Sequence, residues 1–275
     1  MEAELSENMT QNAYETVKLA RAKDRPTSRS YIRELFDGFI PFAGDRRYGE
    51  DPAVIGGIAW FEKIPCTVIG LEKGTDTKDK ILRNFGSAHP EGYRKALRLM
   101  MMAERFRIPV ITLIDTPGAY PGIGSEERGQ SEAIARNLFE MSNLAAPVLS
   151  VVIGEGGSGG ALAIGVCDRL VMLQFSVYSV ISPESCASIL WKSTDKKEIA
   201  ADAMGGTAER LKKLGLVDEV LKEPHGGAHR DPQAMAESVK QSMLKHLGEL
   251  RNQPVTQLLD ARQARLRAFG AFREA

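Results

Sequence analysis

The chain has 275 residues, enough for one large domain or two small ones with a substantial hydrophobic core. Its 36 Lys and Arg residues balance 36 Asp and Glu residues and 43% of it is hydrophobic, so we expect a globular protein with no overall attraction to nucleic acid or to an anionic membrane. No apolar run approaches the roughly 20 residues that span a bilayer, and the polar N-terminus has no signal-peptide core, so the cytoplasm is the expected location.

Residues 1–107 are predicted to contain two short helices, two strands and one long amphipathic helix. The long helix is indicated by Tyr93, Ala96, Met100 and Ala103, which recur at helical spacing on one face. The expected elements, in chain order, are helices at 10–22 and 30–36, a polar loop at 44–49, strands at 53–61 and 66–71, a charged loop at 73–80 and the amphipathic helix at 90–107.

Residues 108–275 alternate between short apolar strands and helices. Such alternation predicts an α/β fold with a largely parallel sheet and helices at its periphery. The expected elements are a strand at 108–114, a Pro- and Gly-rich turn at 115–122, a helix at 126–144, a strand at 146–153, strands at 170–173 and 177–181, helices at 183–191, 199–204 and 208–214, a strand at 216–221, and helix from 232 onward.

The most informative segment is the turn at 153–163, which reads Ile-Gly-Glu-Gly-Gly-Ser-Gly-Gly-Ala-Leu-Ala. It joins a short β-branched strand to a helix of small residues. Glycines at such a junction let the chain turn sharply and let a ligand approach backbone N–H groups without a Cβ in the way. Because those N–H groups lie at the positive end of a helix, the turn suits an anion, either a phosphate or an oxyanion.

Two familiar motifs match this turn by spacing alone. Residues 154–159 satisfy the Gly-x-Gly-x-x-Gly of dinucleotide-binding folds, but the helix is cut short at Gly165 and the strand at 170–174 ends without the required acidic residue. Residues 156–160 satisfy the Gly-x-Ser-x-Gly of a nucleophile elbow, and the downstream histidines leave a hydrolase possible by chain order. The setting of these histidines disfavours that interpretation, because they are predicted to lie in a polar loop or on a solvent-facing helix: His225, His229 and His246.

The third interpretation is an oxyanion hole with no nucleophile attached, in which backbone N–H groups stabilise negative charge on a carbonyl oxygen. A second sharp turn, Asp115-Thr-Pro-Gly-Ala-Tyr-Pro-Gly122, follows the preceding strand. The carboxyl ends of adjacent parallel strands lie side by side, so the two turns are expected to form one cleft. A rigid loop is the purely structural interpretation of Pro117 or Pro121 taken singly.

Several segments resemble, in the same order, the α subunits of the bacterial acetyl-coenzyme A carboxylase carboxyltransferases. They cover nearly the whole chain, although it begins too close to Gly44 to contain the longer N-terminal helical extension of some relatives. The matching segments are 44–48, 73–74, 83–86, 90–99, 115–122, 126–137, 154–162, 179–184 and 226–230.

The resemblance implies a crotonase-like fold, which is a spiral of β-β-α units with peripheral helices. The corresponding division of the chain is an N-terminal helical segment at 1–45, a carboxyltransferase domain at 46–250 and a C-terminal helix at 251–275. The resemblance also implies an α2β2 assembly with a carboxyltransferase β subunit, which carries a zinc ribbon and makes most of the coenzyme A contacts.

The resemblance places biotin on a separate biotin carboxyl carrier protein that works with biotin carboxylase. This chain has no Ala-Met-Lys-Met biotinylation motif, so no covalently bound cofactor is expected on it. Its three cysteines show no Cys-x-x-Cys spacing, so no zinc site is expected either: Cys66, Cys167 and Cys186.

For the reaction, the resemblance implies transfer of a carboxyl group from carboxybiotin to acetyl-CoA, giving malonyl-CoA, the first committed step of fatty acid synthesis. Loss of CO2 leaves negative charge on the ureido oxygen of biotin, which is the expected base for the acetyl methyl group. By resemblance, Gly159 and Gly160 supply backbone N–H groups to that oxygen, and matching glycines of β serve the thioester. The remaining expected substrate contacts are Gly118, Ala119, Gly157, Ala161 and Arg128.

Charged side chains carry weaker expectations. Arg128 or Arg136 can orient a carboxylate, although a solvated or interface arginine is an equally good interpretation. Lysines of the charged loop can hold coenzyme A phosphates, although exposed lysines usually do nothing specific: Lys73, Lys78 and Lys80.

Two other functions stay open at this point. A hydratase or thioesterase acting alone on acyl-CoA would need a catalytic carboxylate near the glycine turn, and Glu155 and Glu184 are the nearest candidates, neither with a clear partner. A scaffold or RNA-binding protein is disfavoured by the balanced charge and by the lack of an aromatic and basic surface pattern.

Overall fold

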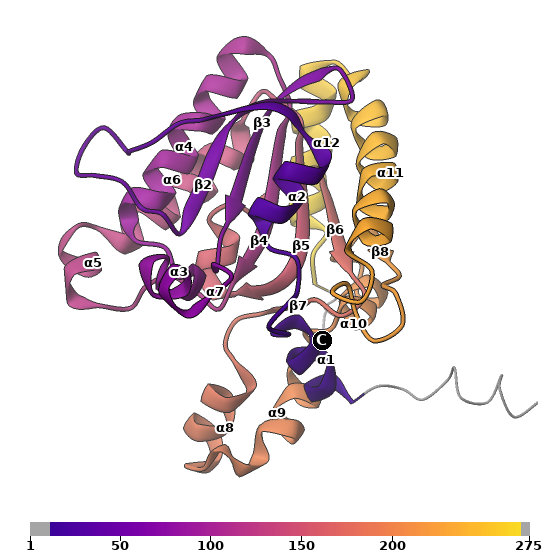
Figure 1. Cartoon of the computed structure of the whole chain (residues 1–275). Helices are drawn as coiled ribbons and strands as arrows, with labels where there is room; N and C mark the ends of the chain where they lie inside the picture. Colours follow the sequence, from indigo (N-terminus) through magenta and orange to yellow (C-terminus); the bar gives the residue numbers. More distant parts are fainter. Residues whose placement is uncertain (1–11, 271–275) are drawn as a thin grey trace, which may run out of the picture.

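A computed structural model describes residues 12–270 and contains one eight-stranded sheet with helices on both faces (Figure 1). The strand order is β1-β2-β3-β4-β5-β6-β8, and β7 pairs with the end of β5. The first three strands are antiparallel, and every pairing from β3 to β8 is parallel. The predicted α/β class with a largely parallel sheet is therefore confirmed.

The elements have the following bounds. The strands are β1 (Asp37–Pro41), β2 (Val54–Phe61), β3 (Ile64–Leu71), β4 (Val110–Thr116), β5 (Val148–Gly157), β6 (Arg169–Leu173), β7 (Val177–Ser179) and β8 (Glu219–Leu221). The helices are α1 (Ala13–Ala20), α2 (Ser28–Leu35), α3 (Thr77–Leu82), α4 (Pro90–Phe106), α5 (Ile123–Glu127), α6 (Gln130–Asn143), α7 (Ser158–Leu162), α8 (Pro183–Trp191), α9 (Lys197–Met204), α10 (Ala208–Lys213), α11 (Pro232–Arg251) and α12 (Val255–Arg267), with single 3₁₀ turns at Asn84–Gly86 and Thr194–Lys196.

Two hydrophobic cores lie on the two faces of the sheet. The central strands β4 and β5 are buried throughout, as expected for parallel strands covered on both sides. Alternate residues point to opposite faces: Val148 and Val152 belong to the core under α4 and α6, whereas Leu149 and Val151 belong to the core under α2 and α11. The sheet is thus the middle of three layers.

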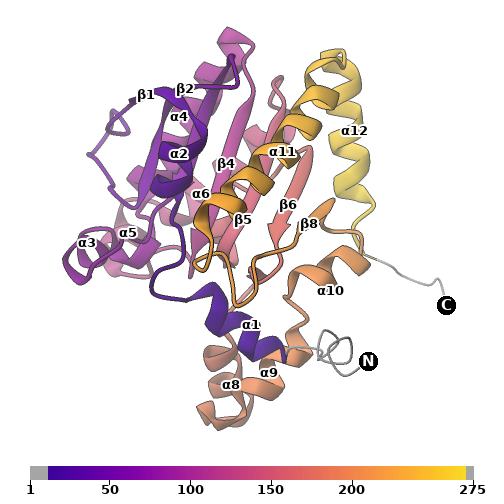
Figure 2. The same ribbon diagram turned by 45° about the vertical axis from the view of Figure 1, so that its right-hand side comes forward.

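Helices α8 and α9 project from the carboxyl end of the sheet, where α1 lies between them and the body (Figures 1 and 2). Helix α1 packs against α9 and also contacts β5 and β7. Segments far apart in sequence therefore meet at the end of β5. Among residues 12–270, no helix is long and apolar enough to cross a membrane.

Several predicted boundaries need correction. Strand β1 was not predicted, and helix α3 lies inside the charged loop, where Asp76 caps it by accepting a hydrogen bond from the Asp79 N–H. The helix predicted at 126–144 is two helices, because Gly129 between them has φ of 84°. Strand β5 continues through the first glycines of the predicted turn as far as Gly157.

The three-part division of the chain stays a prediction, and residues 1–11 and 271–275 of it lie outside the described range. Within that range, the segment at 1–45 is only partly helical, because β1 pairs with β2. Helix α12, at the other end, packs against α6 and buries Arg262.

Candidate functional site

The two glycine- and proline-rich turns lie side by side at the carboxyl ends of β4 and β5. These strands run parallel, with Ile114 opposite Val152 and Thr116 opposite Gly156. The turn after β4 is held internally by the Thr116 hydroxyl, which donates to Gly118 O at 2.9 Å and accepts from Gly118 N at 3.0 Å. The predicted neighbourhood of the two turns is confirmed.

Glycines make this contact possible. A Cβ on Gly157 would lie 2.2 Å from Pro117 O, and a Cβ on Gly160 would lie 2.5 Å from Ala119 N and 2.9 Å from the Tyr93 hydroxyl. Such distances are far inside van der Waals contact, so any side chain at either position would push the turns apart. Both glycines therefore serve packing within the chain, whatever else they do.

Gly159 differs from its neighbours. A Cβ there would meet Ile134 at 3.6 Å, an ordinary contact, and the backbone φ of Gly159 is not positive. Gly159 is half-buried and stands in the first turn of α7, where the first backbone N–H groups of a helix have no intrahelical partner. Nothing within residues 12–270 requires a glycine at this position.

Ser158 has the backbone conformation expected of a nucleophile elbow but lacks the histidine partner of a catalytic triad. Its φ is 53°, a left-handed conformation at a strand-to-helix turn. Within residues 12–270, no histidine donates to or accepts from its hydroxyl. His89 Nδ1 lies 2.6 Å from the Ser125 hydroxyl, and His246 Nε2 lies 2.7 Å from Glu219 Oε2. His246 is buried, so its predicted solvent-facing position was wrong.

A chain of ion pairs runs along the carboxyl edge of the sheet, directly before the glycine turn. Lys73 Nζ lies 2.8 Å from Asp115 Oδ1 and 2.6 Å from Glu155 Oε2. Arg21 Nε lies 2.7 Å from Glu155 Oε1, and its Nη1 lies 2.7 Å from Glu184 Oε1. We call these five residues the carboxyl-edge ion chain.

The two glutamates of the carboxyl-edge ion chain are held ionised. Burial alone would raise the pKa of Glu155, but the positive charges of Lys73 and Arg21 outweigh it and lower that pKa. Burial likewise opposes ionisation of Glu184, yet its hydrogen bonds from Arg21 and Tyr14 bring its pKa to about 2. A carboxylate so held cannot act as a general acid near neutral pH.

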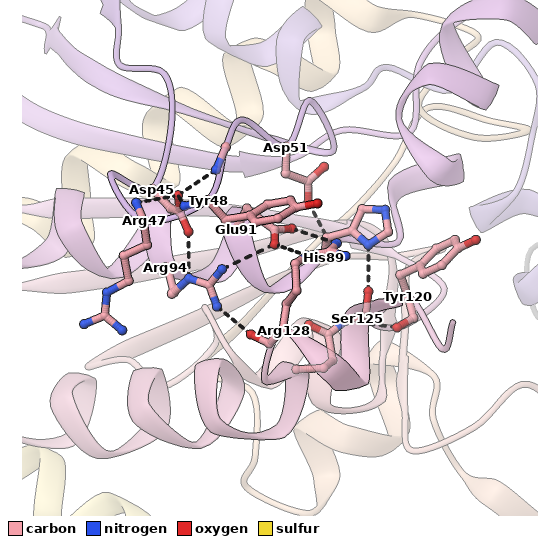
Figure 3. Close-up of polar contacts among 12 residues, drawn as sticks. Asp45, Arg47, Tyr48, Asp51, His89, Glu91, Arg94, Tyr120, Ser125 and Arg128 are labelled. Carbon is pink, nitrogen blue, oxygen red and sulfur yellow. Dashed lines mark hydrogen bonds and ion pairs between the residues drawn. The ribbon is translucent and has the colours of Figure 1, made fainter. Parts of the chain in front are cut away.

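Arg128 lies in a separate polar cluster at the start of α4 (Figure 3). Its Nε lies 2.5 Å from Glu91 Oε1, and its guanidinium stands 4.5 Å from the ring centre of Tyr48. Glu91 also binds Arg94, whose Nε lies 2.7 Å from Asp45 Oδ2. The structure thus gives Arg128 internal partners that join α5, α4 and the 44–49 loop.

The same cluster fixes the entry into α4. Asp51 accepts a hydrogen bond from His89 N at 2.7 Å, and the His89 ring packs against Tyr120 of the turn after β4, with ring centres 4.3 Å apart and planes tilted by 44° (Figure 3). Gln130 donates to Tyr120 O at 3.0 Å. These bonds set the outer side of the Asp115–Gly122 turn.

The structure gathers most of the predicted substrate contacts and separates one. Gly157, Gly160, Gly118 and Ala119 meet where the two turns touch, and Ala161 is buried directly behind them. Arg128 contacts Glu91 and Tyr48 instead. The assignment of these residues to substrate stays a prediction.

Sequence reasoning missed the carboxyl-edge ion chain. Lys73 was expected to be exposed, but its ammonium is mostly buried between two carboxylates. Asp115 and Glu155 at the ends of buried strands were a signal that a cation must lie nearby, because buried charges are paired. Nothing in the sequence distinguishes Arg21 from the other basic residues near the N-terminus.

Within the described part of the chain, no group of three or more His, Cys, Asp or Glu side chains is arranged to hold a metal ion. The three cysteines are unpaired thiols.

Comparison with known proteins identifies close relatives. Residues 1–270 match the model of the family described as acetyl co-enzyme A carboxylase carboxyltransferase-like. The chain is 58% identical over 264 residues to the acetyl-coenzyme A carboxylase carboxyl transferase subunit alpha of Thiobacillus denitrificans, covering 96% of this chain and 82% of that protein. It is 60% identical over 258 residues to the subunit of the same name from Klebsiella pneumoniae, covering 94% and 81%.

Two solved structures with the same fold are distant from this chain in sequence. Transcarboxylase 12S superposes with a TM-score of 0.65 at 17% identity, over 83% of this chain and 43% of that chain. A Pseudomonas malonate decarboxylase hetero-tetramer in complex with coenzyme A superposes with a TM-score of 0.64 at 19% identity, over 80% and 91%. The expected crotonase-like fold is thereby confirmed.

Proposed function

The chain belongs to the family of acetyl-coenzyme A carboxylase carboxyltransferase α subunits, and we propose that its glycine turn is the oxyanion site of that reaction. The α subunit takes part in carboxyl transfer to a coenzyme A ester. In the proposed reaction the acceptor is acetyl-CoA and the product is malonyl-CoA. The carboxyl donor is biotin on a separate carrier protein, which a biotin carboxylase charges.

The proposal is carried by one observation: Gly159 has room for a Cβ within the chain and yet is glycine. A ligand oxygen that approaches the N–H groups of Gly159 and Gly160 would explain this, since a side chain at residue 159 would obstruct it. Biotin supplies a carboxyl group and, after the carboxyl group leaves, a negative charge on its ureido oxygen. Backbone N–H groups suit that charge because they are fixed in place and need little reorganisation.

The proposed site is completed by a second subunit. A carboxyltransferase β subunit, in an α2β2 assembly, would supply the second oxyanion hole for the thioester, most coenzyme A contacts and the zinc ribbon. The proposed base is the biotin ureido oxygen. This choice agrees with the two carboxylates nearest the turn, because both are already engaged in ion pairs. Glu155 and Glu184 are both ion-paired to Arg21.

The same pairing argues against a stand-alone hydratase. That reaction needs a carboxylic acid whose pKa lies near the operating pH. The pKa of Glu155 and that of Glu184 are shifted the other way, below their usual values. Arg128 is proposed only as a support of the α4 entry, since its guanidinium already binds Glu91.

The test is Gly159→Ala in the chain reconstituted with its β subunit. Alanine is favoured over glycine inside a helix by about 0.5–1 kcal/mol, so the variant should fold at least as stably as the parent. The alanine N–H remains, but the added methyl group would obstruct the approach of the ligand oxygen to it. Because loss of one oxyanion interaction typically costs about 100- to 1,000-fold in rate, we expect malonyl-CoA decarboxylation in the presence of free biotin to fall by at least about tenfold. Thermal unfolding and steady-state rates measure the two effects.

Gly248→Ala is the matched control. Gly248 is an exposed glycine inside α11 with nothing within 4 Å of the Cβ position, so this variant should gain similar stability and keep full activity. Gly160 is unsuitable for this test, because a Cβ there collides with Ala119. A Gly159→Ala enzyme as active as the Gly248→Ala enzyme would refute the oxyanion assignment, and activity without β would refute the shared site.

A further inference from the structure

We propose that Glu155 is a positioning residue for carboxyl transfer. Its carboxylate is held between Lys73 and Arg21 and fixes the strand end that leads into Gly157–Gly160. Through Arg21, the position of that strand end depends on the docking of α1, α8 and α9. The inference rests on the proposed function of the glycine turn. It assigns no contact between Glu155 and a substrate.

Both the backbone N–H and the side-chain carboxylate of Glu155 are bound by neighbouring segments. Its N–H donates to Asp115 Oδ1 at 2.9 Å, which links the end of β5 to β4. The same Asp115 oxygen lies 2.8 Å from Lys73 Nζ, which in turn binds the Glu155 carboxylate at 2.6 Å. Three neighbouring segments of the sheet edge are thus joined two residues before Gly157.

The end of β5 borders a pocket on one side. This pocket lies between the sheet edge and the projecting helices. It is lined in part by Pro117, Glu155, Gly156, Gly157 and Thr207. Away from the pocket, Gly157 is closely packed, since a Cβ there would lie 2.2 Å from Pro117 O. On the side that faces the pocket, the strand end is constrained by Arg21 and Glu155 of the carboxyl-edge ion chain.

Arg21 extends this constraint to the projecting helices. Its guanidinium binds Glu155 through Nε and Glu184 of α8 through Nη1, both at 2.7 Å. The Tyr14 hydroxyl of α1 also donates to Glu184 at 2.9 Å, and Ala13 N donates to Asp202 of α9 at 3.2 Å. Movement of α8 and α9 would therefore pull on the carboxylate next to the glycine turn.

Stability alone is a weak reason for this arrangement. Burying charges costs solvation free energy, and apolar replacements of buried ion pairs are often neutral or stabilising. The ion chain instead sets geometry at a point where small displacements matter, since a shift of about 1 Å at a catalytic site can cost about 100-fold in rate.

The experiment uses the chain reconstituted with β and compares Glu155→Gln with Asp218→Asn. Asp218 is the matched control because it also binds an arginine, Arg265 at 2.6 Å, and a backbone N–H, Leu170 at 2.7 Å, but at the start of β6. We expect Glu155→Gln to lower kcat for biotin-dependent malonyl-CoA decarboxylation by about 10- to 100-fold, with KM for malonyl-CoA changed less than about twofold. Asp218→Asn should lower the melting temperature comparably and leave kcat intact.

Arg21→Lys keeps the experiment decisive if Glu155→Gln folds poorly, because Arg21 is one-third exposed. Lysine retains one charge beside Glu155 but cannot bridge to Glu184 as well, so kcat should fall by a smaller factor, again at constant KM. Wild-type kcat in both variants, or equal loss of kcat in Asp218→Asn, would overturn the inference. An inactive wild-type enzyme would instead refute the proposed function.

Discussion

Ion pairs hold both ends of strand β5, but those at the amino end are fully buried whereas those at the carboxyl end extend to partly exposed residues. At the amino end, the Arg262 guanidinium is fully buried and uses all five N–H donors, two on Asp168 and three on the carbonyl oxygens of Met141, Leu144 and Ala146, at 2.7–2.8 Å. At the carboxyl end, the ion chain through Glu155 runs outward to Arg21 and Glu184, which are each about one-third exposed.

The difference separates stability from function along a single strand. The amino-end pair is closed, with every donor satisfied, and touches no loop of the proposed site. The carboxyl-end chain is partly open to solvent and connects the sheet edge to α8. We infer that disruption at the amino end unfolds the protein, whereas disruption at the carboxyl end misplaces a site in a folded protein.

Arg262→Met gives the largest expected effect on stability. It leaves Asp168 buried without its counter-charge, and breaking one side of such a pair costs about 3–5 kcal/mol. Denaturant titration measures the loss. A reduced kcat in the folded fraction of the variant, measured at low temperature with the proposed β subunit, would contradict this separation of stability from function.

Glu184→Gln tests the ion chain at the carboxyl end of β5 through the pH dependence of stability. The pKa of Glu184 falls from 4.5 to about 2 on folding, so its ionised form stabilises the native state above about pH 4.5, and this contribution is lost as the pH falls towards 2. We expect the variant to be less stable than the parent at pH 7 by less than about 1 kcal/mol, because the pair is partly exposed. The two unfolding curves should converge on acidification, and a gap that is independent of pH would contradict the assignment.

Tyr93→Phe gives the smallest expected effect. The Tyr93 hydroxyl is buried against Gly160 and has no hydrogen-bond partner within residues 12–270, whereas each donor of Arg262 has one. Removing an unsatisfied buried hydroxyl should change stability by less than about 1 kcal/mol, towards greater stability. Calorimetry would measure this, and a clear loss of stability would mean that the hydroxyl has a partner in solution.

Much of the fold follows from local sequence. The apolar runs of β4 and β5 and the amphipathic face of α4 are strong periodic signals, and their positions were predicted to within a few residues. The contact between the two turns was predictable as well, because adjacent parallel strands end at one edge. Strand β1 gave no such signal, since Gly38 and Pro41 are poor strand residues and it is mostly exposed.

The partners of charged residues could not be predicted. Arg21 is separated from Glu155 by 134 positions and from Glu184 by 163. The pairing depends on where α1 docks, and α1 docks through contacts with α9 and through a small apolar contact of Val17 and Ala20 with Val177. The motif spacing of 156–160 suggested an elbow, and the left-handed backbone of Ser158 is present without the histidine that would make it a nucleophile.

The position of Arg262 in the chain affects how the protein folds during synthesis. Three carbonyl groups and the carboxylate of Asp168 are complete long before Arg262 is made, since the separations range from 94 to 121 residues. At about 5–20 residues per second, this corresponds to several seconds or more on the ribosome. Over that time these carbonyl and carboxylate groups must stay hydrated, because their hydrogen-bond donor does not yet exist. The nascent sheet can therefore bury this edge only after α12 has left the ribosome.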